Sequence, residues 1–504
     1  MKPVKRKKKL LILLILTVLF LLTMIISCGD SGNSSNSDAN PDNKSNDSPD
    51  SGADSDTEAA KEYVYPTDMK GGGRDFKIAA PETTWFFYTD IVHGEMTGEG
   101  LDDAIYTRNR FIEDKFDIEF KATYVDIESF NAQLRKLVAA GDDVYDAAFC
   151  PMFRGTNFAS MISENIFYNL RDIHTLNLEE QWWNQMIIKE ASLGRGDKLF
   201  FAANDVDIMT LQCLEAVFFN QDMMENLGLE LPYNKVREGK WTFDEFNKYQ
   251  KDGANLNGDT DFRWDKSGNA VYGFISYDNS VNALLDGSGE RYVAVDSDGT
   301  PRLAVENERF INVLRKIESM LAVTDGTYLF ANSMPDFHYE PIFMNGRSMM
   351  TMGELKAADV FREMEPTFGI LPIPKYDENQ EKYYSQHIFA TPMTVIPSTN
   401  QTPDFAGAVL DAMAYVSNRD VTPVLFDVSV SQKQLRNEES IEMLGLIKNS
   451  GSFDVGSAYG WTTDFYNAIR ASLGNGQAFS AASAIDKAQD KINASINKTM
   501  AMFD

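Results

Sequence analysis

From about residue 75 onward, short apolar segments alternate with longer amphipathic ones, and this alternation restricts the possible folds most strongly. The strand-like segments are bounded by turn residues and lie at 75–80, 118–125, 144–150, 198–204, 215–221 and 393–397. Helix-like segments, with apolar residues at helical spacing, lie at 102–114, 310–322, 404–418 and 485–496. Such an alternation predicts an α/β fold built from βαβ units.

The N-terminus has the pattern of an export signal. Six of the first ten residues are Lys or Arg, and Leu10–Ile26 then carries no charge. An uncleaved membrane anchor is the alternative, since the apolar run is nearly long enough to span a bilayer. The string ISCGD, which follows that run, resembles the bacterial lipobox, whose cysteine is acylated and becomes the new N-terminus. We therefore predict a lipoprotein signal peptide at 1–27 and lipid, such as palmitate, on Cys28.

Residues 28–70 are rich in Ser, Asn and Asp, so we expect a disordered acidic tether between the membrane and a folded body. The formal net charge of the chain is −28, and removal of the basic signal peptide makes it more negative still. A surface of this charge repels phosphate backbones, which argues against nucleic-acid binding. We read the acidic exterior as a solvated, soluble surface.

The length after the tether, about 440 residues, exceeds one ordinary hydrophobic core and predicts two lobes. Besides Cys28, the chain has only Cys150 and Cys213. An extracytoplasmic compartment would allow these two to pair, but two cysteines do not make a disulfide scaffold. We favour two buried free thiols.

No catalytic or cofactor motif stands out. The four histidines have no metal-ligand spacing to one another, and the chain contains neither a G-x-S-x-G elbow nor a phosphate loop. Pairs of acids are common, but 75 acidic residues make such pairs expected by chance. We therefore expect no cofactor, although a glycosidase-type carboxylate pair brought together in space would escape a search of the sequence.

One segment has the alternating oxygen side chains of a calcium loop. Its candidate ligands are Asn255, Asn257, Asp259 and Asp261. The sixth position of such a loop should be Gly and the twelfth an acid, and here they are Thr260 and Lys266. A surface turn rich in Asn, Asp and Gly is therefore favoured over a metal site.

Four phrases in a fixed order are more specific than these motifs. They read FNQDMMENLG (219–228), EGKWTFDEF (238–246), FMNGRSMM (343–350) and FGILPIPKY (368–376). Together with the lipobox, the series resembles family 1 extracellular solute-binding proteins, the substrate receptors of sugar-type ABC importers. Each phrase also has a local reading: Thr242 and Glu245 form a capping box, and Trp241 before it is expected in the core.

The resemblance implies a type II periplasmic-binding-protein-like fold, with two lobes joined by a hinge of several crossing segments near 205–214, 325–335 and 385–396. We expect residues 71–205 plus 331–390 in the N-terminal lobe and 206–330 plus 391–504 in the C-terminal lobe. A small-molecule sugar would be trapped between the lobes and passed to ABC permease subunits. The receptor would act as a monomer and without a catalytic step.

Ligands of such folds meet the loops that follow strand C-termini. Sugars expose hydroxyls, which polar side chains bind, and apolar faces, which aromatic rings cover. We looked for both kinds of side chain just past strand-like segments; Tyr277, Asp278 and Asn279, for example, follow the segment 272–276, and the resemblance to sugar-binding members adds Trp461. The predicted ligand-binding residues are Glu82, Trp85, Phe153, Arg154, Asn204, Asp205, Tyr277, Asp278, Glu354 and Trp461.

Two other functions remain open from the sequence. One is a surface carbohydrate-active enzyme that uses two acids, and the other is a ligand sensor for a membrane kinase. The favoured function is a lipid-anchored receptor on the extracellular face of the cytoplasmic membrane, which captures a carbohydrate, such as an oligosaccharide, for import.

Overall fold

The computed structural model describes most of the chain after the expected tether. The described residues are 62–84, 87–152, 157–195, 197–262, 268–321, 326–330, 339–388, 390–431, 438–474 and 481–503. All of them belong to one compact unit, Glu62–Asp504. The signal peptide, Cys28, and most of the tether lie outside the described residues, as do Trp85, Phe153 and Arg154.

The first of two main sheets has the strand order β12-β3-β1-β2. Its strands are β1 (Arg74–Glu82), β2 (Ile118–Asp126), β3 (Ala147–Pro151) and β12 (Pro392–Val395). The first three strands run parallel, and β12 runs antiparallel to β3. Helices on and around this sheet form what we call the first lobe. They are α2 (Gly100–Phe116), α3 (Phe130–Ala139), α4 (Phe158–Ser163), α5 (Gln185–Ala191), α14 (Pro403–Val416) and α15 (Thr422–Ser431).

The second sheet has the order β10-β4-β9-β5-β8. Its strands are β4 (Glu215–Asn220), β5 (Tyr272–Tyr277), β8 (Thr327–Phe330), β9 (Ser348–Glu354) and β10 (Phe368–Leu371). Strands β8, β5 and β9 run parallel, and β4 runs antiparallel to both of its neighbours. In each sheet, therefore, the strand that follows a crossing between the sheets is the one whose direction is reversed.

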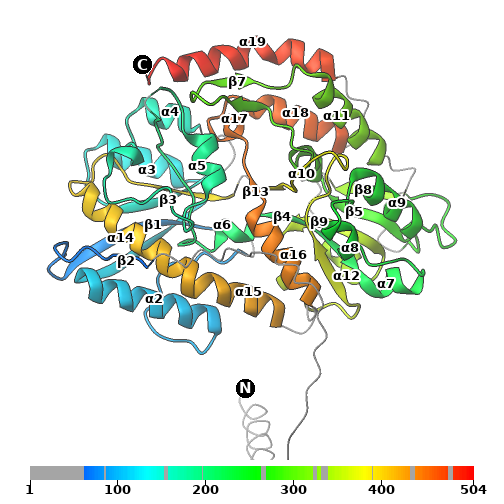
Figure 1. Cartoon of the computed structure of the whole chain (residues 1–504), viewed down its shortest axis with the longest axis horizontal. Coiled ribbons are helices and arrows are strands. Elements are labelled where there is room, and N and C mark those ends of the chain that lie inside the picture. The colour runs from blue at the N-terminus through cyan, green and yellow to red at the C-terminus, as the bar shows by residue number, and fades with distance from the viewer. Residues whose placement is uncertain are drawn as a thin grey trace, which may run out of the picture. The chain divides into compact units, whose positions relative to one another are not determined.

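The helices around the second sheet form the second lobe (Figure 1). They are α7 (Gln221–Asn226), α8 (Tyr233–Arg237), α9 (Phe243–Gly253), α10 (Ser280–Gly287), α11 (Glu308–Met320), α12 (Glu340–Met344), α13 (Ala357–Phe361), α16 (Glu438–Asn449), α17 (Val455–Ala458), α18 (Thr463–Gly474) and α19 (Ala481–Met500). A hairpin of β6 (Val293–Val295) and β7 (Pro301–Leu303) also belongs to this lobe, and α19 packs against β7, α11 and α18.

The chain crosses between the sheets at 205–214, which contains α6 (Met209–Gln212), and again at 385–391. These crossings touch: Leu214 bridges to His387, and Ile388 N–H donates to the Cys213 carbonyl. Beside them, β11 (Ser385–Gln386) pairs with β13 (Gly451–Ser452). The segments that join the two lobes thus support one another through backbone hydrogen bonds.

The strand pairing corrects the expected division of the lobes at two places. Strands β9 and β10 fall within 331–390, which we expected in the first lobe, but both pair in the second sheet. Strand β12 falls within 391–504, which we expected in the second lobe, but it pairs in the first sheet. The expected crossing near 325–335 is likewise wrong, because β5 before it, β8 within it and β9 after it share one sheet.

Five of the six predicted strands are confirmed, and the segment 198–204 is not a strand. It makes isolated bridges only, from Lys198 to Leu193, from Ala202 to Thr394 and from Asn204 to Trp183. Because its ends pair with different partners, the segment cannot extend a ladder along β12. The four predicted helices are confirmed as α2, α11, α14 and α19.

Local expectations within the core are also confirmed, although of the expected capping box the structure shows the bond to the Thr242 hydroxyl alone. Trp241 is fully buried, and its indole N–H donates to the Pro372 carbonyl at 2.9 Å. The Thr242 hydroxyl accepts the Glu245 N–H and caps α9. Cys150 and Cys213 are both buried and free. Across the described residues, no helix is long and apolar enough to cross a membrane.

Candidate ligand-binding site

Three strands of the second sheet bring polar side chains to one edge. The parallel strands β5 and β9 end there at Tyr277 and Glu354. Strand β4 runs the other way and begins there at Glu215, which lies directly opposite Glu354 in the register. Residues opposite each other in an antiparallel pair project to the same side of the sheet, so the two carboxyl groups become neighbours.

A single phenol joins these two carboxyl groups. The Tyr277 hydroxyl lies 2.5 Å from Glu215 Oε1 and 2.8 Å from Glu354 Oε1. Asn279 follows Tyr277, and its Nδ2 donates to the same Glu215 oxygen at 3.0 Å. The Tyr339 ring stacks on the Tyr277 ring, with centroids 5.7 Å apart, and fixes its orientation.

Elements from outside the sheet complete the network. The Tyr466 hydroxyl, on α18, donates to Asn279 Oδ1 at 2.6 Å. Gln386, on the crossing segment, receives a longer contact of 3.4 Å from Asn279 Nδ2. Arg470, also on α18, lies 3.6 Å from Asp278 Oδ2. The edge therefore lies where the second sheet, α18 and a crossing segment meet.

Burial dominates the electrostatics of this edge. Glu215 is fully buried, and desolvation, together with the nearby Glu354 charge, raises its pKa to about 8. Burial also raises the pKa of Glu354. The Tyr277 phenol has a pKa well above its usual value, because it is buried and faces both carboxyl groups.

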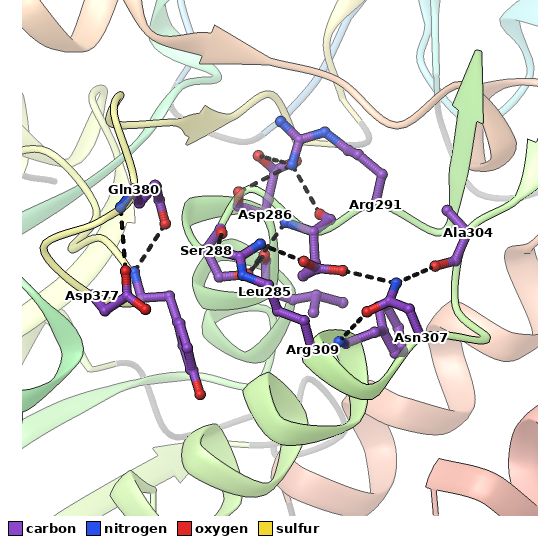
Figure 2. Close-up of polar contacts among 12 residues, drawn as sticks. Leu285, Asp286, Ser288, Arg291, Ala304, Asn307, Arg309, Asp377 and Gln380 are labelled. Carbon is purple, nitrogen blue, oxygen red and sulfur yellow. Dashed lines mark hydrogen bonds and ion pairs between the residues drawn. The ribbon is translucent and has the colours of Figure 1, made fainter. Parts of the chain in front are cut away.

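The far end of α10 is fixed by a second polar cluster, which Figure 2 shows. Arg291 lies 3.3 Å from Asp286 Oδ1, and the Ser452 hydroxyl on β13 donates to the same carboxylate. Arg309 pairs with Glu290 and donates to the Ser288 carbonyl at 2.9 Å. These contacts tie the end of α10, which begins just after Asn279, to β13, the strand that pairs with β11 of the second crossing.

The structure brings three of the predicted residues, Tyr277, Asp278 and Glu354, to this edge. Glu82 is exposed at the end of β1. Asn204 is buried, and its Oδ1 accepts the Val206 N–H at 3.0 Å within the first crossing.

Two other predicted residues make internal contacts. Asp205 accepts from Asn418 Nδ2 at 2.7 Å and pairs with Lys448 at 3.3 Å, so it ties the crossing to the helices around it. Trp461 is buried, stacks on Tyr459 and donates to Thr499 Oγ1 at 2.9 Å. Its ring thus packs within the second lobe.

Sequence reasoning missed Glu215, Gln386 and Tyr466. One signal was available for Glu215: an ionisable residue heads an otherwise apolar strand, immediately after a crossing. Gln386 and Tyr466 are ordinary polar residues of a loop and a helix. Only the tertiary contacts bring them to the edge.

The calcium candidates form a turn that is closed by its own hydrogen bonds. Asn255 Oδ1 accepts the Asn257 N–H at 2.8 Å, and Asp259 Oδ2 accepts the N–H groups of Asn269 and Ala270. Asn257 has a φ of 49°, as in a left-handed turn. Within the described ranges, no group of three or more His, Cys, Asp or Glu side chains could hold a metal ion.

The lobes also meet on the side of the second lobe that carries α19. The Gly194 N–H, in the turn after α5, donates to the Gly299 carbonyl in the β6–β7 turn at 2.9 Å. Phe503, which follows α19, stacks on Phe200 of the first lobe, with centroids 5.5 Å apart. A groove of about 570 Å³ lies beside this contact and is lined by the α5 region and the β6–β7 turn.

Comparison with protein-family models and with curated proteins gives no match. Solved structures do resemble the chain. A cyclo/maltodextrin-binding protein complexed with maltotetraose has a TM-score of 0.56 at 13% identity, with 85% of this chain and 98% of that chain covered. The cyclic α-maltosyl-1,6-maltose binding protein of Arthrobacter globiformis has a TM-score of 0.56 at 11% identity, with 85% and 100% covered.

A third similar structure is the ABC substrate-binding protein of Listeria monocytogenes in complex with cycloalternan. Its TM-score is 0.54 at 12% identity, with 84% of this chain and 99% of that chain covered. Similarity at these identities establishes the fold. The chain therefore has the two-lobe, type II periplasmic-binding-protein-like fold that the sequence predicts.

Proposed function

We propose that the chain is a lipid-anchored extracytoplasmic receptor that captures a carbohydrate between its two lobes and delivers it to an ABC importer. The observation that carries the proposal is the polar edge of the second sheet. Carboxyl, phenol and amide groups of Glu354, Tyr277 and Asn279 gather where crossing segments join the lobes. Such groups bind sugar hydroxyls, and a sheet edge of this kind is where open α/β folds bind ligands.

The similar solved structures support the same proposal. One was solved with maltotetraose and another with cycloalternan. Their resemblance covers most of this chain, so both lobes take part in it. The lipobox, with Cys28 as acylation site, supports anchoring beside a permease, and the hinge supports closure around the ligand.

The proposed site comprises Tyr277, Asp278 and Glu354 from the sequence prediction, with Asn279 and Tyr466 added, and the fully buried Glu215 supports these side chains from within the sheet. Glu82 remains a candidate from the first lobe, as do Trp85, Phe153 and Arg154. A receptor fits this site better than a two-acid hydrolase does. The Glu215 carboxyl is fully buried and contacts Tyr277 and Asn279, so it cannot reach a glycosidic bond.

Calorimetric titration of the purified full-length chain with a panel of neutral oligosaccharides tests the function. We expect binding of at least one member, recovery of that sugar uncut, and loss of at least tenfold in affinity in the Glu354→Gln variant. The matched control is Glu365→Gln, an exposed glutamate of the same lobe, which should bind like the wild type. Binding restricted to peptides or metal ions would contradict the proposal.

A further inference from the structure

The hydrogen atoms available for hydrogen bonds among Glu215, Tyr277 and Glu354 are too few if both carboxyl groups are ionised. A tyrosine hydroxyl has one hydrogen, and an ionised carboxylate only accepts hydrogen bonds. Tyr277 Oη lies within hydrogen-bond distance of one oxygen of Glu215 and one oxygen of Glu354. With both carboxyl groups ionised, the phenol could satisfy one of them, and the other contact would place two acceptor oxygens together.

The remaining donors do not remove this shortage. Asn279 accepts the Tyr466 hydroxyl through Oδ1 and donates from Nδ2 to Glu215 Oε1. The second oxygen of Glu215, Oε2, is buried and has no hydrogen-bond partner among the described residues. A buried ionised oxygen without a donor is costly, whereas a neutral carboxyl group is tolerated.

The charged groups around the pair do not replace the missing hydrogen. Asp278 follows β5, and Glu340 lies on α12, so both add negative charge nearby. Arg470 on α18 is positive, but it pairs with Asp278. The phenols of Tyr339 and Tyr466 are neutral, and burial raises the pKa of both of them.

Two further titratable groups lie on the crossing segments next to β4. The Cys213 thiol is buried, and its pKa is well above the usual value. Burial lowers the pKa of His387 to about 4, which makes its imidazole neutral at pH 7. No cation among these groups is left to balance two carboxylates.

We propose that Glu215, Tyr277 and Glu354 hold one shared proton at neutral pH, as a chain in which the Glu215 carboxyl donates to the phenol and the phenol donates to Glu354. Loss of this proton at alkaline pH leaves two adjacent carboxylates with one donor between them. The sheet edge and the Asn279–Tyr466 contact then loosen. The raised pKa values of both glutamates agree with this arrangement.

Infrared difference spectroscopy of the full chain tests the proton directly, with no ligand. The carbonyl band of a protonated carboxyl group should be present at pH 7 and disappear on alkaline titration. Glu215→Gln and Glu354→Gln should each lower its intensity, because the phenol hydrogen then serves the one remaining carboxylate. Glu365→Gln should leave the band unchanged. Persistence of the full wild-type intensity in both single variants would overturn the proposal.

The effect on binding rests on the proposed function and is measured separately. For one linked proton, the affinity for a bound oligosaccharide should fall about tenfold per pH unit above the midpoint of the infrared titration. Glu215→Gln should abolish this dependence. A pH-independent affinity in the wild type would overturn the link to binding. If no sugar binds, the proposed function fails, while the infrared result still decides the shared proton.

Discussion

Two buried carboxyl sites of this molecule differ in their supply of donors. Asp411, on α14 of the first lobe, is fully buried and receives four N–H groups: the backbone and side-chain amides of Asn177 and the indoles of Trp182 and Trp183. At the edge of the second sheet, two carboxyl groups share one phenol. Asp411 and Glu215 are thus equally buried, but only Asp411 is surrounded by N–H donors.

The largest effect on stability is expected at Asp411, which receives four N–H groups. Asp411→Ala leaves the indole N–H groups of Trp182 and Trp183 buried without an acceptor, and we expect a loss of about 3–5 kcal/mol in the free energy of unfolding. Denaturant unfolding measures it. Asp404→Ala on the same helix is the control, because this exposed side chain accepts one backbone N–H, from His174, and should cost about 1 kcal/mol. Equal losses of unfolding free energy in Asp411→Ala and Asp404→Ala would show that the four donors at Asp411 add no special stability.

At the sheet edge, where Glu215 and Glu354 share one phenol, we expect stability to depend on pH. The folded chain keeps the Glu215 proton up to about pH 8, whereas a glutamate of ordinary pKa, 4.5, loses it much earlier. The unfolded state therefore binds fewer protons across this interval, so stability falls as pH rises from about 5 to 8 and levels off above. In Glu215→Gln the slope should be shallower, by up to about 1.4 kcal/mol per pH unit.

The phenol can be removed without changing the ring. In Tyr277→Phe, the two carboxyl groups lose the group between them, and we expect a loss of about 1–3 kcal/mol in stability at pH 8, from a buried contact left unmade. At lower pH, where protonation supplies hydrogen atoms to the carboxyl groups, the loss should be smaller. A loss independent of pH would indicate that Tyr277 acts through packing alone.

The smallest effect on stability is expected at Tyr466, which contacts Asn279 rather than the carboxyl groups. Tyr466→Phe removes the hydroxyl that orients the Asn279 amide, at a cost of about 0.5–1.5 kcal/mol in stability. Because Asn279 can then turn, the infrared band should shift in frequency but persist. Thermal unfolding and the same spectra measure both effects. Disappearance of the band would mean that the amide, and not the phenol, decides the charge state.

The sequence predicts the fold well, because strand and helix periodicity depends on local residues. The segment 198–204 shows the limit: it is apolar enough for a strand, but its partners differ along its length. The division of the lobes was wrong at 331–390, since no local signal reports which sheet β9 and β10 join.

The site was predicted in part for a related reason. Tyr277, Asp278 and Glu354 were predicted because they lie at or just after strand ends, and the structure places them at the ends of β5 and β9. Glu215 was missed because β4 runs in the opposite direction, so its first residue, rather than its last, reaches the same edge. Trp461 was expected to face a ligand, but an indole that stacks on a sugar and one that stacks on Tyr459 look the same in sequence.

The contact between Phe503 and Phe200 has a practical consequence. Helix α19 packs on the second lobe, yet the residues after it end against the first lobe. A fluorophore attached at the C-terminus, paired with a quencher on the exposed Glu128 position of the first lobe, would therefore register any change in the separation of the lobes. The chain offers a natural attachment point for an optical reporter that needs no insertion into either core.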